Sequence, residues 1–189
     1  MQRLPRASTS TVSGVISNGS GSPGLTKNGT GTLTLSGNNT YNGTTTLNAG
    51  TVVIGHANGL GTTGNITFSG GALQYSTGIT QDISSRIRNS GSAIIVDTNN
   101  NNVTFGTALD ASNGGGLTKQ GTGTLTLSVS NTLTGPLQVT GGTLSLSSGT
   151  LSINTASAST ISGTLSGSGS LTKQGAGTLT ITNNNSGYS

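Results

Sequence analysis

The residues able to do acid–base chemistry are few in this chain of 189 residues. Asp82, Asp97 and Asp110 are its three carboxylates. Enzymes that cleave polysaccharides need two carboxylates close in space, one as acid and one as base or nucleophile. Because the spacing from each aspartate to the next is shorter than one turn of the structure expected below, we interpret all three as solvated corner residues. The sequence therefore predicts no catalytic residue.

Metal-binding residues are equally scarce. His56 is the single histidine and cysteine is absent, whereas a metal centre usually combines several His, Cys or carboxylate ligands. We interpret His56 as an exposed corner residue. The calcium-binding nonapeptide repeat needs Asp after its glycines, but Gly114-Gly115-Gly116 is followed by Leu117. We expect no metal and no cofactor.

Three lysines, Lys27, Lys119 and Lys173, recur at one position of a repeated motif. They could form a row of amines that contacts an anionic surface sugar. Alternatively, each stem covers a corner while the amine caps backbone carbonyls, and we favour this structural interpretation. The net charge is +4 and aromatic residues make up 3%, without the dense basic stripe of a nucleic-acid-binding protein. We expect no nucleic-acid partner.

The repeated motif begins Leu-Thr-Lys, continues through a Gly-x-Gly turn and ends in alternating apolar residues. Its copies lie at residues 24–35, 116–127 and 170–181. Glycine supplies turn conformations, and period-two alternation is typical of a strand with one buried face. The positions that we predict to be structural are Leu25, Lys27, Gly29, Gly31, Leu33, Leu35, Leu117, Lys119, Gly121, Gly123, Leu125, Leu127, Leu171, Lys173, Gly175, Gly177, Leu179 and Ile181.

Short strands separated by Gly/Asn corners are predicted along the rest of the chain. Residues 1–11 are polar and are expected to form an irregular lead-in, followed by a single β-domain over 12–189 with motif copies near 24–54, 116–146 and 170–189. Ile79–Asn89 has isoleucines four apart, as in a helix, but the flanking β pattern favours a strand. Further strands are expected at residues 44–47, 51–54, 66–68, 73–75, 94–96, 103–105, 136–139, 143–146 and 151–153.

The repeats indicate a parallel β-solenoid. Leu117 lies 92 residues after Leu25, and Leu171 lies 54 after Leu117. A turn of roughly 18–23 residues, here called a rung, fits these offsets and would give about nine rungs. Predicted inward residues are Leu33, Leu35, Val52, Ile54, Ile66, Phe68, Val103, Phe105, Leu125, Leu127, Leu144, Leu146, Leu151, Ile153, Leu179 and Ile181.

Two other architectures are less favoured. A β-sandwich needs hairpins and a core of larger residues, and this chain has no tryptophan. With 29% hydrophobic and 5% charged residues the chain is unusually polar, but a disordered linker would not keep apolar pairs in register.

Residues Leu25–Thr45 and Leu47–Val52 resemble the autotransporter-associated β-strand repeat, also called the passenger-associated transport repeat. The second copy departs from the first at Val129 and Leu133, and the third is cut short. The resemblance implies a right-handed parallel β-helix in the passenger of a bacterial type V secreted protein. It further implies a role in export and folding and a C-terminal outer-membrane barrel, which is missing from this sequence.

The resemblance makes a non-enzymatic scaffold or stalk of a surface or secreted protein the leading functional hypothesis. An adhesin that binds glycan or a host surface, or that self-associates into fibres, is the alternative, and a polysaccharide-active enzyme is a third. The first eight residues hold two arginines without an apolar segment, so they do not form a secretory signal. We expect an extracellular or cell-surface location and a processed, internal or recombinant piece of a longer protein.

Overall fold

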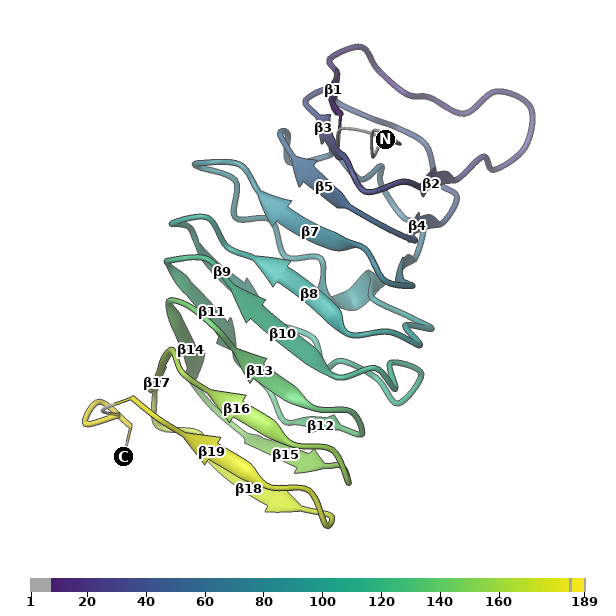
Figure 1. Cartoon of the computed structure of the whole chain (residues 1–189). Helices are drawn as coiled ribbons and strands as arrows, with labels where there is room; N and C mark the ends of the chain where they lie inside the picture. The colour runs from purple at the N-terminus through teal and green to yellow at the C-terminus, as the bar shows by residue number, and fades with distance from the viewer. Residues whose placement is uncertain (1–7, 184, 189) are drawn as a thin grey trace, which may run out of the picture.

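The computed structural model describes residues 8–183 and 185–188, which form a parallel β-solenoid of about eight turns (Figure 1). Every strand pair in this part of the chain is parallel. This confirms the predicted solenoid. The one helix of the described residues is a short 3₁₀ turn, Ser84–Arg86, and no helix there has the length and apolar character to cross a membrane.

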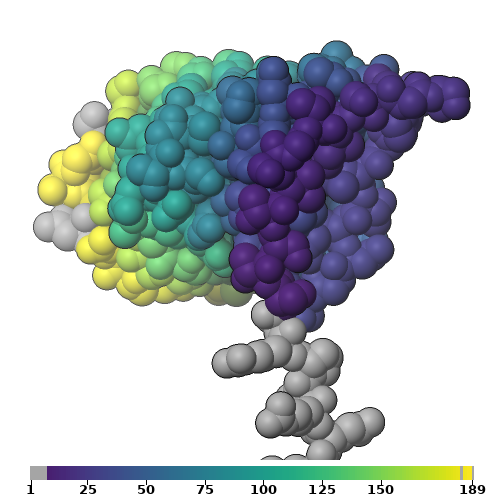
Figure 2. Space-filling view, turned by 90° about the horizontal axis from the view of Figure 1, so that it is seen from above, coloured from purple at the N-terminus to yellow at the C-terminus, as the bar shows by residue number. Residues whose placement is uncertain are grey.

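One sheet runs along the whole solenoid. Its nine strands, in order, are β1 (Thr9–Val12), β3 (Thr32–Leu35), β5 (Thr51–Ile54), β7 (Ala72–Tyr75), β8 (Ile94–Asp97), β10 (Leu117–Gln120), β13 (Leu137–Val139), β16 (Ser159–Ile161) and β19 (Leu179–Ile181). Each strand belongs to a successive rung. Figure 2, seen from above, shows the first rung in purple lying across the end of the stack.

Shorter sheets form the other sides. A four-stranded sheet forms a second side. In the rungs that contain it, its strand follows the strand of the nine-stranded sheet along the chain: β9 (Asn102–Phe105), β11 (Thr124–Leu127), β14 (Thr143–Leu146) and β17 (Thr164–Ser166). Two three-stranded sheets lie before it: β2 (Leu25–Lys27), β4 (Thr45–Leu47) and β6 (Ile66–Phe68), then β12 (Asn131–Leu133), β15 (Thr150–Asn154) and β18 (Ser170–Gln174).

The strand register gives the rung length. The rung length is the number of residues from one strand position to its partner in the next rung. In the nine-stranded sheet this step is longest in pairs such as Thr9 with Thr32, and shortest from Thr32 to Thr51. The other steps of this sheet lie within these limits, as between Val52 and Leu73. The predicted rung of roughly 18–23 residues is therefore confirmed. Adjacent rungs lie about 4.8 Å apart, as paired strands do.

Alternation places one apolar row after another along the axis. Thirteen of the sixteen predicted inward residues are buried: Leu35, Val52, Ile54, Ile66, Phe68, Val103, Phe105, Leu125, Leu127, Leu144, Leu146, Leu151 and Ile153. Leu33 and Leu179 are half-buried and pack against this core. Ile181 is 44% exposed, so its predicted burial is wrong. It lies on β19, which pairs with β16 on one side and has no strand on the other among the described residues.

Two local predictions need correction. Residues 9–11 of the expected irregular lead-in form the start of β1, while residues 1–7 lie outside the described residues. The strand expected over Ile79–Asn89 is wrong. Asp82 Oδ1 accepts a hydrogen bond from the Ser84 backbone N–H at 2.8 Å, the chain then makes the 3₁₀ turn, and Ile87 forms a single bridge with Ile66. A side chain that captures a backbone donor diverts it from a sheet ladder.

The motif copies do not all lie on the same sides of the solenoid. In the first and third copies, Leu-Thr-Lys lies on a three-stranded side (β2, β18) and the strand after it lies in the nine-stranded sheet (β3, β19). In the middle copy, β10 lies in the nine-stranded sheet and β11 in the four-stranded one. The offset from the first copy to the second is thus four rungs plus one side, and that from the second to the third is two rungs plus two sides.

Candidate functional site

The recurring lysines sit at corners of the solenoid, where their stems continue inward-facing apolar rows. Lys119 pairs with Val96 and Val139 in the ladder, and its side chain is fully buried. Its Nζ donates hydrogen bonds to the carbonyl oxygens of Gln120 (2.7 Å), Gly121 (2.8 Å) and Gly141 (3.2 Å). The first two belong to the lysine's own corner and the third to the next rung.

Lys27 repeats this geometry on another side of the solenoid. Its Nζ donates to the carbonyl oxygens of Asn28 (3.0 Å), Gly29 (2.7 Å) and Ala49 (3.2 Å), and the residue is 8% exposed. As with Lys119, the third acceptor lies 22 residues later, in the next rung.

Lys173 differs in its third contact. Its Nζ donates to the carbonyl oxygens of Gln174 and Gly175 (3.0 Å) at its own corner, and to Thr155 (3.5 Å) in the preceding rung. The three amines therefore turn onto backbone carbonyls, and they occupy two different corners of the solenoid. This arrangement does not provide the row of free amines that contact with an anionic sugar would need.

Two glycines make the Lys119 corner possible. Gly121 has φ +69°, a left-handed conformation that points its carbonyl at the amine. Gly142 of the next rung has φ +60°, and a Cβ there would lie 2.3 Å from Gly123 O, 2.6 Å from Gly121 O and 3.0 Å from Lys119 Nζ. Burial lowers the pKa of Lys119 to about 8, partly opposed by the carboxylate of Asp97.

The carboxylates satisfy backbone and side-chain donors of their own surroundings. Asp82 is exposed, and its Oδ2 accepts from the Gly106 N–H of the next rung at 2.8 Å. Asp97 Oδ1 accepts from Asn99 N (2.9 Å) and its Oδ2 from Gln74 Nε2 (2.7 Å). Asp82 thus holds an exposed corner, whereas Asp97, predicted as a solvated corner residue, is half-buried at the end of β8, and the two aspartates do not share a hydrogen-bond partner.

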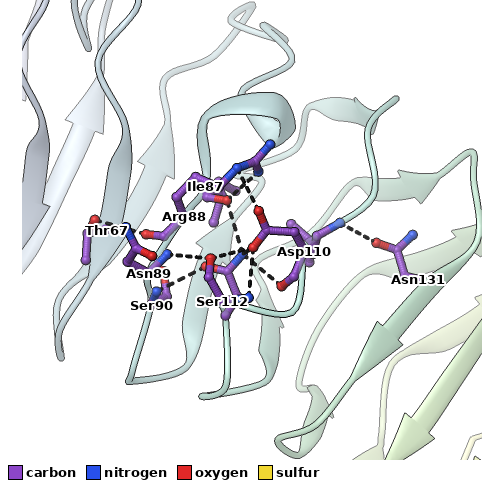
Figure 3. Close-up of polar contacts among 10 residues, drawn as sticks. Thr67, Ile87, Arg88, Asn89, Ser90, Asp110, Ser112 and Asn131 are labelled. Atoms are coloured by element: carbon purple, nitrogen blue, oxygen red, sulfur yellow. Dashed lines mark hydrogen bonds and ion pairs between the residues drawn. The ribbon is translucent and has the colours of Figure 1, made fainter.

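Asp110 forms the charged corner shown in Figure 3. Its Oδ2 pairs with Arg88 Nε at 2.8 Å, while Oδ1 accepts from the Ser112 hydroxyl and from the Ser112 N–H at 2.9 Å. The Ser112 hydroxyl oxygen in turn accepts from Asn89 N, one rung earlier, at 2.8 Å. The Ser112 hydroxyl, backed by its N–H and by Arg88, lowers the pKa of Asp110.

His56 is half-buried rather than exposed, and its Nδ1 accepts from the Asn58 backbone N–H at 3.0 Å. Within residues 8–183 and 185–188, no three His, Cys, Asp or Glu side chains gather into a metal-binding group.

A set of buried asparagines was missed by sequence reasoning. In each, Oδ1 accepts a backbone N–H from the preceding rung, at 2.7–3.1 Å; they are Asn39 (from Ile16), Asn101 (from Gly78), Asn113 (from Ser90) and Asn131 (from Leu109). The Asn131 contact is visible in Figure 3. Their signal in the sequence was weak because asparagine is also frequent at exposed turns.

The outer face of the four-stranded sheet carries two rows of small polar residues. One row is Asn102, Thr124, Thr143 and Thr164, and the other is Thr104, Thr126, Ser145 and Ser166. Neither row includes a charged residue. The face therefore presents hydroxyl donors and acceptors at the regular spacing of the rungs.

Two comparisons with known proteins relate this chain to autotransporter passengers. Residues 25–54, 117–146 and 171–189 match the passenger-associated-transport-repeat family. The adhesin BmaC autotransporter of Brucella suis biovar 1 (strain 1330) is 34% identical over 153 residues, which cover 74% of this chain and 4% of that protein. No solved structure matches the chain.

Proposed function

Because this chain carries three passenger-associated transport repeats, we propose that it is a non-enzymatic structural segment in the surface-exposed passenger of an autotransporter-type protein. Its role is that of a stalk, which spaces other modules and supports export and folding of the passenger. Its partner in the parent protein is a membrane barrel. The location on the bacterial surface or outside the cell follows from the kinship with an autotransporter.

The observation that carries the proposal is the continuous ladder of the nine-stranded sheet. It joins the rungs from β1 to β19, and no buried side-chain nitrogen or oxygen of the described residues lacks a hydrogen-bond partner. A rod of this kind derives its stability from contacts between neighbouring rungs. Such a rod is suited to holding other modules apart. It is less suited to polysaccharide cleavage, because the separated aspartates offer no acid pair.

The buried asparagines support a role in stepwise folding. Asn131 Nδ2 donates to Val129 O at 2.7 Å and Asn101 Nδ2 to Thr98 O at 2.8 Å, both within the asparagine's own rung. A folded rung thus holds an oriented acceptor for the chain on its N-terminal side. Refolding kinetics of N- and C-terminal truncations test this, and equal stability of all pieces would contradict a nucleating end.

The scaffold role is tested in the parent protein on its host cell. Residues 8–188 are replaced by a Gly/Ser linker of equal length, and surface display and protease resistance of the passenger are measured. We expect the linker to lower both, because a flexible coil neither templates rungs nor holds a fixed reach. Unchanged display and resistance would overturn the proposal.

Adhesion is the second candidate. The name of the Brucella relative and the hydroxyl-rich face of the four-stranded sheet favour it. Glycan arrays and cell-binding assays with the purified chain test it, with Thr126→Glu and Ser145→Glu placed in the centre of that face. Binding that these changes abolish would establish an adhesin, whereas an inert result in both assays favours the scaffold. Polysaccharide turnover lost in Asp82→Ala or Asp97→Ala would instead indicate an enzyme.

A further inference from the structure

The strands that follow the lysine corners carry little information about their own register. The strand β11 reads Thr-Leu-Thr-Leu and its partner β14 reads Thr-Leu-Ser-Leu. A slip of two residues would keep leucines inward and hydroxyls outward, so the alternation tolerates it. In the structure the register is nevertheless defined, with Thr126 opposite Ser145. Another feature has to select it.

The corner that precedes these strands has a single-register geometry. Lys119 Nζ reaches its third acceptor, Gly141 O, only when that residue lies over the lysine's own corner. Gly142, the next residue, lies so close to the backbone oxygens of Gly123 and Gly121, with Lys119 Nζ beside them, that a Cβ could not be placed there. In a register slipped by two positions, Thr140 or Leu144 would take the place of Gly142 and bring a branched side chain into this narrow site.

The first motif copy has the same arrangement on another side of the solenoid. A Cβ at Gly50 would lie 2.3 Å from Gly31 O, 2.6 Å from Gly29 O and 2.8 Å from Lys27 Nζ, and Gly50 has φ +68°. Here too the corner precedes a strand pair, β3 and β5, in defined register. Since the two corners lie on different sides, the arrangement belongs to the repeat and not to a fixed side of the fold.

We propose that Lys27 and Lys119, each together with the glycine above it in the next rung, are register locks that each select one alignment of the following strand pair. Lys27 with Gly50 and Lys119 with Gly142 are the two locks, and each lysine acts as a positioning residue. One repeat then comprises two stacked corners, the first with the lysine and the second with the glycine. This inference stands independently of where the protein is displayed or what it binds.

Cysteine cross-linking tests the lock, because the chain has no cysteine of its own. Partners in adjacent strands lie about 4.8 Å apart and can form a disulfide, whereas positions two residues out of register lie about 8 Å apart and cannot. Thr126→Cys with Ser145→Cys reports the observed register. Thr126→Cys with Thr143→Cys reports the slipped one.

With Lys119 present, we expect the first pair to oxidise and the second to remain reduced. In Lys119→Met, which keeps the apolar stem and removes the amine, we expect the slipped pair to oxidise as well. Thr34→Cys with Val53→Cys is the control, because Lys27 still locks that pair and its cross-link stays unchanged. A folded Lys119→Met chain that forms the first cross-link alone would overturn the proposal.

A second variant covers the case in which Lys119→Met does not fold. Lys27→Met is combined with Thr34→Cys and Val53→Cys for the observed register, and with Thr34→Cys and Thr51→Cys for the slipped one. Oxidation of the slipped pair supports the lock. Retention of the observed register, or failure of both methionine variants to fold, would show that the lysines act on stability and not on register.

Discussion

Lys119 Nζ and the carbonyl oxygen of Gly141 lie 3.2 Å apart, although 22 residues separate them in the sequence. The contact joins two rungs at a corner. Because the amine is buried there, it loses the water that would hydrate it. The desolvation shows in the pKa of Lys119, which burial lowers to about 8. Asp97 in the preceding rung, the nearby charge, opposes the shift.

This lowered pKa predicts that stability rises with pH in the alkaline range. Between about pH 8 and the ordinary lysine pKa of 10.5, the unfolded chain holds a proton that the folded chain has lost. Unfolding in this range takes up a proton, which becomes less favourable as the pH rises. The free energy of unfolding therefore increases with pH, by about 3 kcal/mol over the whole window. Above pH 10, the raised pKa values of the buried tyrosines Tyr41 and Tyr75 reverse the trend, because only the unfolded chain ionises them.

Urea unfolding at pH 7, 8, 9 and 10 and constant ionic strength measures this profile. The control is Lys119→Met, which lacks the titrating amine and should show no rise between pH 8 and 10. Parallel profiles for the two proteins would contradict the assignment to Lys119.

Removal of a buried asparagine should destabilise the solenoid locally. Asn131→Ala leaves the Leu109 N–H without its acceptor, and an unsatisfied buried donor costs about 1–3 kcal/mol. The control is Asn42→Ala, at an exposed position. Urea midpoints compare the two, and the hydrogen exchange of the Leu109 amide should accelerate in Asn131→Ala alone. An equal loss of stability in both variants would contradict the role of Asn131.

The fold could be predicted because its signal is repeated. Alternation at Thr32–Leu35 and Thr124–Leu127 identified strands, and the recurrence of the motif identified stacking. The burial of Ile181 was mispredicted because alternation reports which face a side chain is on and not whether another rung covers it. The strand expected over Ile79–Asn89 failed because Asp82 captures a backbone donor, a contact that periodicity does not contain.

The lysine corners were only partly accessible from the sequence. A lysine that recurs beside glycine suggests a capped corner, and the three amines do lie on carbonyls. Only the strand topology shows that Lys119 lies at a different corner from Lys27. The role of Gly142 required distances, since its constraint comes from the backbone oxygens of Gly123 and Gly121, and from Lys119 Nζ, in the preceding rung.

The charged corner predicts an order of effects on Asp110. The Ser112 hydroxyl is the largest cause of its lowered pKa, and Arg88 is the smallest of those that lower it. Ser112→Ala should therefore raise the Asp110 pKa more than Arg88→Met does, which ¹³C NMR titration of the carboxyl group measures. Because Arg88 and Asp110 are 29% and 41% exposed, loss of the pair should cost at most about 1 kcal/mol, and less at high salt. A larger shift in Arg88→Met would contradict this order.

Deletion of one whole rung should preserve the fold, because the solenoid depends on contacts between neighbours and not on a unique core. Removal of residues 51–71 joins Gly50 to Ala72. In the intact solenoid, Ala72 is the partner of Thr51 in the next rung, so it can take the place of Thr51. Leu73 and Tyr75 then take the inward places of Val52 and Ile54, so Thr32 faces Ala72 in the same register.

Removal of residues 51–60 is the matched disruption, since it takes out about half a rung and brings corner residues opposite strands. Circular dichroism and urea unfolding compare both deletions with the full chain. We expect the 51–71 deletion to keep the β spectrum and a cooperative transition with a smaller m-value, because less surface is exposed on unfolding. The 51–60 deletion should lose the cooperative transition. Equal tolerance of both deletions would show that rungs are not the unit of stability, whereas equal failure would show that this rung is individually required.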